Sequence, residues 1–385
     1  MEEILLKADN VFYILMLLSV GYLFVFAFFS MFGGKKRYPV SSKKLKFAVI
    51  IPAYKEDSVI EESVKSMLAQ DYPDDKIVVM VVSDQMSDET NNRLKLLPIK
   101  LVIINPPKSS KAVALQYAAD NLKGLKCDGV IVLDADNVAQ NTFVSEINDA
   151  FGFGSSAVQT HRTAKNLNND MAILDAVSEE INNSIFRKGH VCLGLSSALI
   201  GSGMAFEYEW FDYNVKKLST AGEDKEMERL LLKERIFIDY LDYTMLYDEK
   251  IQKEEAFFNQ RRRWIASQIG ALVKGIKDFP GALFSFNIDY LDKILQWMFL
   301  PRIVLLGLTS IMSFVLTVIN WRLSLKWWLL LIMLLLTFAM ALPDFLVTPR
   351  NIRAIKKLPV IFIMMVVNFF RVKGVNKNFI HTQKG

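Results

Sequence analysis

Long uncharged runs of apolar residues occur at both ends of the chain, whereas the middle mixes short apolar stretches with polar ones. From Val11 to Phe32 no side chain is charged. A helix rises ~1.5 Å per residue, so about 20 such residues cross the ~30 Å hydrocarbon layer of a bilayer. A signal peptide has a shorter apolar stretch, whereas this run is long and ends at a basic cluster. The run therefore predicts a retained transmembrane helix.

Three further apolar runs lie near the C-terminus. Ile303–Trp321 and Trp327–Leu342 carry no charge and are separated by a stretch that contains Arg322 and Lys326. Their length and composition predict two more transmembrane helices. The last run, Leu358–Phe370, is shorter and has basic residues on both sides. This pattern is typical of a helix that is re-entrant or lies in the membrane interface.

The distribution of charge predicts an orientation in the membrane. Acidic residues dominate before the first apolar run, and six basic residues follow it: Lys35, Lys36, Arg37, Lys43, Lys44 and Lys46. Because Lys and Arg collect on the cytosolic side, the N-terminus is predicted outside and the middle segment in the cytosol. The chain is thus expected to be a multi-pass integral membrane protein. Cys127 and Cys192 lie in the cytosolic segment and are expected to be reduced and unpaired.

Between about Leu45 and Trp264, short β-branched runs alternate with stretches of helical spacing. The predicted strands are Phe47–Pro52, Ile77–Val82, Leu101–Asn105 and Val130–Leu133, and the predicted helices are Ile60–Gln70, Thr90–Leu97 and Lys111–Leu122. This alternation favours an α/β fold with a mostly parallel sheet flanked by helices. Ligands of such sheets bind beyond the carboxyl ends of the strands. The residues that follow each strand are therefore the candidate site residues.

Composition excludes several classes of protein. The 385 residues are 52% hydrophobic and 23% charged, with Gly 18, Pro 11 and Cys 2. So many apolar residues exclude a disordered chain, and the glycine, proline and cysteine numbers exclude a collagen-like or disulfide-stapled one. The formal net charge of +5 fits a nucleic-acid-binding protein poorly, because much of the excess lies beside the membrane helices.

Carboxylates follow three of the four predicted strands. Glu56 and Asp57 follow the first, Asp84 the second, and Asp134 and Asp136 the fourth. A lone Asp after a strand is usually a helix cap or a turn residue, but three such exits exceed what composition alone would give. Alternate residues of an extended segment point the same way, so Asp134 and Asp136 can face one cation. Such oxygen ligands suit Mg²⁺ or Mn²⁺ bound together with phosphates.

Motifs of other enzyme classes are missing from the sequence. No GxxxxGK[ST] or GxGxxG pattern follows a predicted strand, so the P-loop and dinucleotide-binding classes lose their main support. Neither HExxH nor CxxC occurs, which leaves zinc without a candidate site. His161, His190 and His381 are too scattered to indicate a histidine-led site.

A series of short motifs occurs in order between Phe47 and Trp264: IIPAYKED, VVSDQMSD, LDAD, GSG, AGED and QRRRW. In order, spacing and placement at strand ends, the series resembles the membrane-bound family-2 glycosyltransferases. That group includes cellulose, chitin and hyaluronan synthases and ceramide glucosyltransferases. The resemblance implies a GT-A-type mostly parallel sheet flanked by helices. It also implies one N-terminal and two to three C-terminal membrane or interfacial helices.

The resemblance assigns the donor site. It implies that the uridine and the nucleotide are held by Ala53, Tyr54, Glu56, Asp84 and Lys111. Asp134 and Asp136 match the DxD pair of the family, in which the second Asp usually coordinates the metal, Mg²⁺ or Mn²⁺, that bridges the UDP phosphates. Such a cation stabilises the negative charge that builds on the departing diphosphate.

The resemblance also assigns the catalytic base and the acceptor side. Glu223 and Asp224 match the ED motif, whose Asp accepts the proton of the attacking hydroxyl. The alternative interpretation is an acidic first turn of the helix Lys225–Lys233, which the helix dipole favours. The QxxRW signature corresponds to Gln260, Arg263 and Trp264, which are implied to bind diphosphate and acceptor sugar. The alternative there is a basic juxtamembrane cluster that holds anionic headgroups.

Two weaker matches extend the resemblance. Gly201 and Ser202 fall where the family often lines the acceptor site, and the stretch before His161 resembles the VQTPH stretch of cellulose synthases without its proline. Near the C-terminus, Phe379–Lys384 resembles the FxVTxK gating loop of those synthases, with Thr382 and Lys384 in matching positions.

The sequence therefore predicts a metal-dependent, inverting glycosyltransferase that moves a sugar from a UDP-sugar to a membrane-associated acceptor at the cytosolic face. Two acceptors stay open, a growing polysaccharide and a lipid. The AGED and QRRRW motifs favour polysaccharide slightly. Against it, relatives build their export channel from more helices than the three predicted here, so this chain would need a partner or a homo-oligomer. A non-catalytic nucleotide-sugar-binding membrane protein is disfavoured, because such a protein has no need of the base.

The expected domains follow these patterns. They are a transmembrane helix at 1–34, a cytosolic GT-A domain at 45–265, an amphipathic or interfacial segment at 266–300, two transmembrane helices at 301–345, and an interfacial or re-entrant helix with a basic tail at 350–385.

Overall fold

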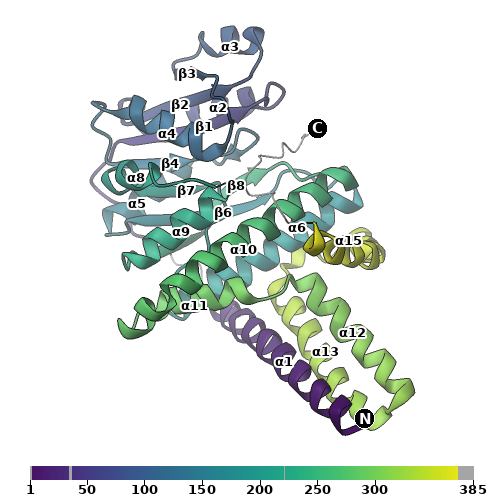
Figure 1. The fold of residues 1–385 in the computed structure, drawn as a ribbon. Coiled ribbons are helices and arrows are strands. Elements are labelled where there is room, and N and C mark those ends of the chain that lie inside the picture. The colour runs from purple at the N-terminus through teal and green to yellow at the C-terminus, as the bar shows by residue number, and fades with distance from the viewer. Residues whose placement is uncertain (1, 34–36, 221, 372–385) are drawn as a thin grey trace.

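A computed structural model describes residues 2–33, 37–220 and 222–371 and consists of a sheet domain and a bundle of long helices (Figure 1). The bundle contains α1 (Glu2–Phe32), α12 (Arg302–Ile319) and α13 (Trp321–Ala341). Within the described part of the chain, these three helices are long and apolar enough to cross a membrane. The apolar runs predicted to span therefore form the three candidate spans.

The sheet has eight strands in the order β3-β2-β1-β4-β7-β6-β8-β5. Their bounds are β1 Phe47–Tyr54, β2 Ile77–Asp84, β3 Lys100–Ile104, β4 Gly129–Val132, β5 Val138–Ala139, β6 Ala157–Ala164, β7 Met204–Glu207 and β8 Ile238–Asp248. The half formed by β3, β2, β1 and β4 is parallel. In the other half, β7 pairs antiparallel with β4 and β6, β6 pairs parallel with β8, and β5 pairs antiparallel with β8. The predicted mostly parallel sheet is confirmed, with a mixed second half.

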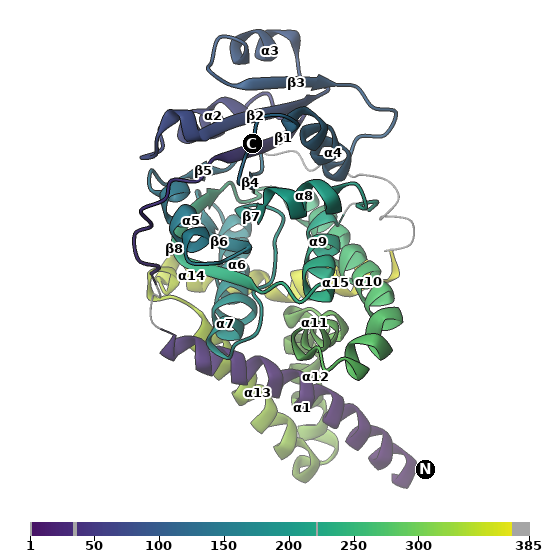
Figure 2. The same cartoon turned by 90° about the vertical axis from the view of Figure 1, so that its left-hand side faces the viewer.

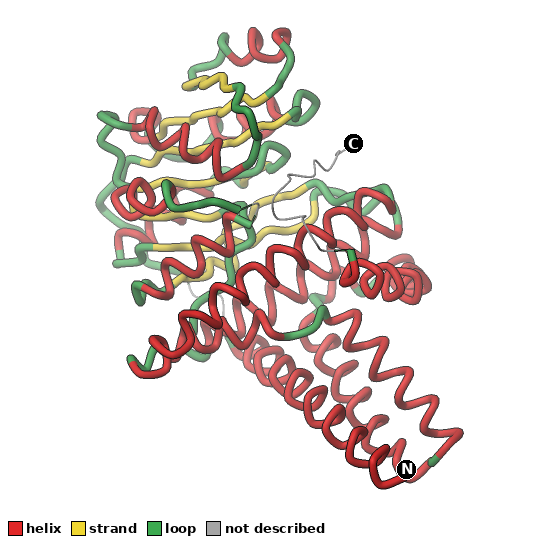
Figure 3. The backbone as a smooth tube through the Cα atoms, viewed as in Figure 1, coloured by secondary structure: helices red, strands yellow, loops and turns green. Residues whose placement is uncertain are grey.

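Helices cover both faces of the sheet. Successive residues of its central strands point to opposite faces, and on both faces these residues are apolar. In β1, Ala48 and Ile50 pack toward one core, and Phe47, Val49 and Ile51 pack toward the other. The first core is closed by α4 (Lys111–Leu122), α8 (Tyr208–Val215) and α9 (Glu223–Lys233), and the second by α2 (Ile60–Leu68), α3 (Asp88–Leu94) and α5 (Phe143–Gly152). Figure 3 shows the strands gathered in one part of the molecule and helices alone in the other.

Two helices connect the sheet domain to the bundle. The 31-residue helix α10 (Glu254–Phe284) carries the predicted QRRRW motif and runs unbroken across residues 265 and 266, where a domain boundary was expected. It is followed by α11 (Ile288–Met298). Both helices contribute to the core on the α9 side of the sheet, through Ala271 and Ala282 of α10 and Ile294 of α11. Helices α10 and α11 are therefore fixed to the sheet domain on its α9 side.

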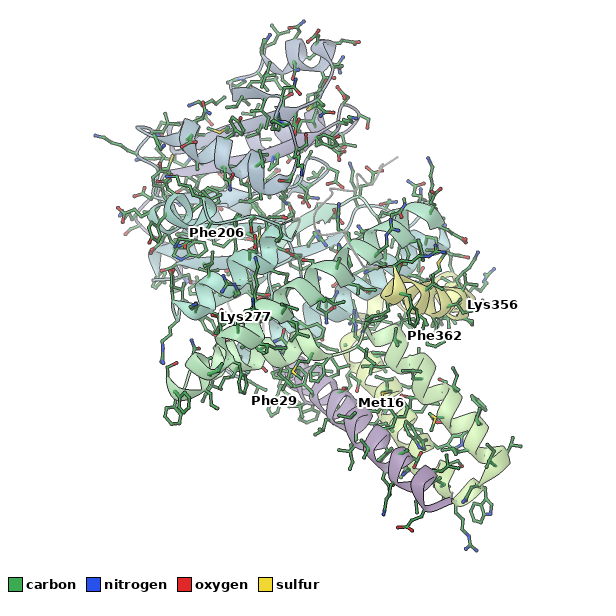
Figure 4. All side chains as sticks on the ribbon, viewed as in Figure 1. Met16, Phe29, Phe206, Lys277, Lys356 and Phe362 are labelled. Atoms are coloured by element: carbon green, nitrogen blue, oxygen red, sulfur yellow. The ribbon has the colours of Figure 1, made fainter. Side chains whose placement is uncertain are left out.

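The last described helices lie across the end of the bundle. α14 (Pro349–Ala354) is followed by α15 (Leu358–Phe370), which coincides with the run predicted to be interfacial or re-entrant. Figure 1 shows α15 end-on while α12 and α13 run obliquely in the plane, and Figure 2 shows α15 from the side. Phe362 of α15 packs on α12 at Gly307, where an added Cβ would stand 2.2 Å from the Phe362 ring (Figure 4). α15 thus crosses α12, and its interfacial or re-entrant placement stays a prediction.

A π-helical stretch joins the sheet domain to α1. α6 (Asp170–Asn182) continues as the π-helix Asn183–Gly189 and ends in α7 (His190–Cys192). Gly189 lies against the α1 backbone, since an added Cβ would stand 2.2 Å from the carbonyl oxygen of Phe26. Next to it, the His190 ring stacks on Phe26 at 3.6 Å between centroids. π-helical turns occur often at functional sites, and this one also turns Arg187 toward the interior.

Candidate active site

The carboxyl ends of β1, β2 and β4 open into one cavity of about 770 Å³ that continues past α10 to the membrane helices. Most of the predicted site residues line it: Ala53, Tyr54, Glu56, Asp84, Lys111, Asp134, Asp136, Gly201, Glu223, Asp224, Gln260, Arg263 and Trp264. Ser202 lies outside the lining, and Thr382 and Lys384 lie outside the described residues. Segments more than 200 residues apart along the chain thus meet at one site.

Asp84 closes the end of the cavity at the last residue of β2. Its side chain is buried, and burial raises the pKa of the carboxyl. Oδ1 has no hydrogen-bond partner among the residues that the structure describes. A buried acceptor without a donor is costly, so this oxygen is positioned to accept an N–H from a ligand.

Asp134 and Asp136 follow β4 and line the cavity together. Ser202 accepts a hydrogen bond from the Asp134 backbone N–H at 2.9 Å, and Asn137 donates to Oδ1 of Asp136 at 3.2 Å. Ser202 is thus a support beneath the Asp pair rather than a lining residue. In the described part of the chain, no three His, Cys, Asp or Glu side chains gather into a metal-binding group. Two carboxylates fit a hard divalent cation that takes its remaining ligands from phosphates and water.

Lys111, the first residue of α4, connects the two acidic motifs. Its Nζ pairs with Asp134, donates to the Gly201 carbonyl at 2.6 Å and lies 3.6 Å from Oε1 of Glu223. Burial alone would lower the pKa of Lys111, but the carboxylates of Asp134 and Glu223 outweigh it and raise that pKa above its usual value. The cavity therefore holds a charged ammonium beside the Asp pair, where a diphosphate would bring negative charge.

Glu223 and Asp224 form the first turn of α9, after Gly222 at the N-cap. The pair begins a helix, as the alternative interpretation expects, and it also lines the cavity; its role as the catalytic base stays a prediction. Gly201 lies against them at φ +86°, and an added Cβ would stand 3.6 Å from Oε1 of Glu223 and 4.0 Å from Cβ of Asp224. Because that backbone region suits glycine, the loop after Leu199 can run close to the carboxylates.

The carboxyl of Glu223 titrates near neutrality. Burial, with the nearby charge of Asp224, raises the pKa of Glu223 to about 7. A Glu in an unfolded chain has a pKa of about 4.3. Between these values the folded state binds more protons than the unfolded state, so the free energy of unfolding falls as pH rises.

We expect Glu223→Gln to remove this fall in stability between about pH 5 and pH 7, because the amide cannot ionise. The measurement is the midpoint of thermal unfolding of the detergent-solubilised protein across that range, followed by tryptophan fluorescence. Glu209→Gln changes an exposed carboxyl on α8 and should leave the pH profile of the midpoint unchanged. A Glu223→Gln profile that still declined like that of the unaltered protein would contradict this assignment.

The QRRRW motif occupies the α10 wall of the cavity. Gln260 lines the cavity with Oε1 buried and without a partner among the described residues. Arg261 pairs with Asp175, and its guanidinium lies 4.2 Å above the Trp264 ring centroid. Arg263 also lines the cavity. The motif thus contributes both hydrogen-bonding groups and an aromatic ring held in place by a cation–π contact.

Sequence reasoning did not identify a further group of arginines that line the cavity. Arg162 pairs with Glu179 at 2.8 Å and Arg187 with the same carboxylate at 3.1 Å, and all three line the cavity with Arg302. Burial alone would raise the pKa of Glu179, but the two guanidiniums hold it well below its usual range. The one available signal was a basic residue, Arg302, directly before an apolar run.

His161, in the stretch that resembles VQTPH, makes its contacts outside the cavity. Its Nε2 lies 3.1 Å from Glu180, and Nδ1 lies 2.9 Å from the Tyr240 hydroxyl. His161 is not among the lining residues, whereas its neighbour Arg162 is. The stretch that resembles VQTPH therefore reaches the cavity through Arg162.

Beyond Trp264 the cavity walls become aliphatic. α12 and α13 contribute Leu306, Leu335, Phe338, Ala339 and Leu342, and α15 contributes Leu358, Ile361 and Met365. Leu335 is 50% exposed. The apolar end of the cavity is therefore lined in part by two candidate membrane spans, α12 and α13.

A sheet of this order, with carboxylates at its strand ends and a cavity between them, defines the GT-A type of glycosyltransferase fold. The chain belongs to the glycosyltransferase-like family 2, whose family model matches residues 45–267.

Three known proteins illustrate the similarity. A probable glycosyltransferase of Bacillus subtilis, YdaM, is 28% identical over 153 residues, which cover 35% of this chain and 36% of the relative, so the match spans about a third of its length. The fold is similar to that of the mannosyltransferase PcManGT from Pyrobaculum calidifontis, solved with GDP-Man and Mn²⁺ (TM-score 0.52, 15% identity, 86% of this chain and 97% of the other). A structure of S. aureus TarS 1-349 with UDP-GlcNAc matches at TM-score 0.42 and 15% identity over 86% of this chain and 90% of the other.

Proposed function

We propose that this protein transfers a sugar from a nucleoside diphosphate sugar to a hydroxyl group of a membrane lipid, at the cytosolic face of the membrane. The observation that carries the proposal is the single cavity, which joins the carboxylates at the strand ends to aliphatic walls formed by α12, α13 and α15. A polar sugar donor fits the first part of the cavity, and the chains of a lipid fit the second. A soluble acceptor would leave the apolar part without a role.

The donor end favours a uridine nucleotide and a divalent cation. The unpartnered Oδ1 of Asp84 is a suitable acceptor for the imide N–H of uracil. Asp134 and Asp136 would hold Mg²⁺ or Mn²⁺, which would stabilise negative charge on the diphosphate. The mannosyltransferase of similar fold binds GDP-Man with Mn²⁺, in keeping with a donor of this general class. Because Oδ1 of Asp84 can accept the imide N–H of uracil, the nucleotide that we propose for this chain is UDP.

The side chains of this chain support a single displacement. The acceptor oxygen forms a bond to the anomeric carbon, the bond from that carbon to the diphosphate oxygen breaks, and the electron pair leaves with the diphosphate. Asp224 receives the proton of the acceptor hydroxyl, while Lys111 and Arg263 neutralise the leaving group. From an α-linked donor this reaction inverts the configuration and gives a β-linkage.

A growing polysaccharide is the second candidate acceptor. The AGED and QRRRW motifs, which contribute Glu223, Asp224 and Trp264 to the cavity lining, resemble those of polymer synthases and support it. Against it, a hydrated glycan is poorly matched to walls such as Leu306 and Leu342, whereas a lipid chain suits them. The three candidate spans would also need a partner or further copies to surround a channel. The lipid acceptor is therefore the better supported of the two.

The deciding experiment is mass analysis of the product that membranes containing the protein form from radiolabelled UDP-sugars. One sugar added to a lipid is the expected result. A ladder of masses would overturn the lipid assignment in favour of polymer synthesis. Release of free UDP with no product, in the presence of all lipids of the host membrane, would contradict transfer to a lipid.

Blocking the apolar end of the cavity tests the same proposal from the acceptor side. We expect Ala339→Trp to lower transfer to lipid by about tenfold or more, because the indole would occupy space meant for a lipid chain. UDP affinity should stay unchanged. Leu336→Trp, on an exposed part of the same helix that does not line the cavity, is the matched control and should transfer normally. Equal activity of the two variants would contradict a lipid path along α13.

A further inference from the structure

Four arginines and two carboxylates lie together on the wall between the strand ends and the membrane helices. The arginines are Arg162, Arg187, Arg261 and Arg302, and each lines the cavity. Glu179 pairs with Arg162 and Arg187, and Asp175 pairs with Arg261. The two carboxylates therefore form ion pairs with three of the four guanidiniums, and neither forms one with Arg302.

Arg302 is the first residue of α12, the helix that begins a candidate membrane span. Its Nη2 donates to the Ser178 carbonyl at 2.9 Å and to the Ser178 hydroxyl at 3.3 Å. Nη1 is buried and has no hydrogen-bond partner in the part of the chain that the structure describes. No described carboxylate forms an ion pair with Arg302. A buried guanidinium without a counter-charge is costly, and an anionic ligand would remove that cost.

A second unpartnered donor lines the same cavity. The indole Nε1 of Trp297, on α11, is buried and has no partner among the described residues. Apolar lining residues flank Arg302 along the chain, with Leu300 before it and Ile303 and Leu306 after it. Arg302 thus places one positive charge within an apolar stretch of the cavity wall. A molecule with one anionic group next to hydrocarbon chains matches this arrangement of groups.

The donor diphosphate is a poor match for Arg302. Its charge is met at the strand ends by Lys111 and by the cation proposed at Asp136, together with Arg263 of the QRRRW motif. Arg302 belongs to a candidate membrane helix, and its hydrogen bonds go to Ser178 of α6 and not to the strand ends. A second anion is therefore needed to satisfy it.

We propose that Arg302 binds the phosphate of the acceptor lipid, so that the acceptor is a phosphate-bearing lipid with a free hydroxyl group in its headgroup. The inference rests on the proposed function and narrows its acceptor class. The phosphate is held at the start of α12, the chains extend along α12 and α13, and the hydroxyl reaches Asp224. Arg302 acts here in acceptor binding and takes no part in the displacement itself.

The test is a comparison of lipid binding by the full-length protein in detergent, measured by native mass spectrometry. The probes are dioleoyl phosphatidic acid and dioleoylglycerol, which share their chains and differ in the phosphate. We expect the unaltered protein to retain phosphatidic acid about tenfold or more over dioleoylglycerol, and Arg302→Gln to lose this preference. Glutamine can still donate to the Ser178 carbonyl. Arg302→Lys keeps the charge and should keep the preference for phosphatidic acid.

Three controls separate this result from other causes. Arg353→Gln removes an exposed charge on α14 near the membrane and should keep the preference; an equal loss there would mean non-specific attraction and would overturn the proposal. UDP affinity should be the same in Arg302→Gln as in the unaltered protein. A parallel loss of UDP binding would assign Arg302 to the donor and overturn it. Inorganic phosphate at millimolar concentration should not displace the lipid, and displacement would reassign the site to free phosphate.

Failure of the phosphate subsite and failure of the proposed function give different results. If the product is a neutral glycolipid and Arg302→Gln forms it at the unaltered rate, the phosphate subsite is refuted while lipid glycosylation stands. If the product is a ladder of polysaccharide, the proposed function fails whatever Arg302 binds.

Discussion

Replacing Asp224 with asparagine is expected to lower kcat by about 10²- to 10⁴-fold, the range typical for loss of a positioned acid or base. Asp224 lines the cavity in the first turn of α9 and is the carboxylate proposed to receive the acceptor proton. The amide has nearly the same shape but cannot accept that proton. The donor site is built from other residues, so UDP affinity should not change.

The measurement for Asp224→Asn is initial-rate kinetics with a saturating donor, paired with UDP binding by calorimetry. Asp120→Asn makes the same chemical change on an exposed residue at the far end of α4 and serves as the control, with kcat expected within about twofold of normal. Turnover of Asp224→Asn at the rate of the unaltered protein would refute its role as the base. A loss of UDP binding would show instead that the substitution disturbs the donor site.

Replacing Asp136 with asparagine is expected to abolish the stimulation of nucleotide binding by Mn²⁺ and to lower turnover about 10³-fold. Asp136 is a buried carboxylate that faces the cavity beside Asp134. A bound cation lowers the barrier by several kcal/mol through the charge on the diphosphate, and each ~1.4 kcal/mol is a factor of ten in rate. The neutral amide of asparagine is a much weaker ligand for a hard cation.

Calorimetric titration of UDP with and without Mn²⁺ checks this effect on donor binding. The unaltered protein should bind UDP more tightly with the metal, and chelation by EDTA should make it resemble Asp136→Asn. Asp120→Asn is again the control and should keep the full metal effect. Metal-stimulated binding that survives in Asp136→Asn would place the cation elsewhere.

The parallel half of the fold could be predicted because its signals are local. Strands such as β1 and β2 are continuous apolar runs that end in polar residues, and both are buried on two faces. Helix α4 begins at Lys111 and ends at Leu122, as its spacing predicts. The antiparallel β7 could not be predicted in the same way, since its sequence MAFE has no β-branched residue and its place depends on pairing with distant strands.

The candidate site shows the same division between local and distant information. The acidic motifs were visible as motifs, but the bridge from Lys111 to Gly201 and Glu223 joins segments about a hundred residues apart. Arg302 could not be singled out, because its meaning depends on which carboxylates are already paired. A sequence gives the order of residue types. A charged side chain without a counter-charge, such as Arg302, can be recognised only when the positions of the neighbouring carboxylates are known.

Helix α10 is a continuous part of the cavity wall that connects the sheet domain to α11. It carries Trp264 at the cavity and continues to Phe284 at the hairpin with α11, which is ~30 Å along the axis at ~1.5 Å per residue. Because α10 is one continuous helix that packs into the sheet core, the cavity wall that carries Trp264 is held at a fixed place relative to the sheet. A lipid whose chains lie against α12, α13 and α15 would present its headgroup hydroxyl at one fixed distance from Asp224. With the proposed lipid acceptor, the hydroxyl of the newly added sugar would stand further out than the base, and a fixed site of this kind would favour a single addition.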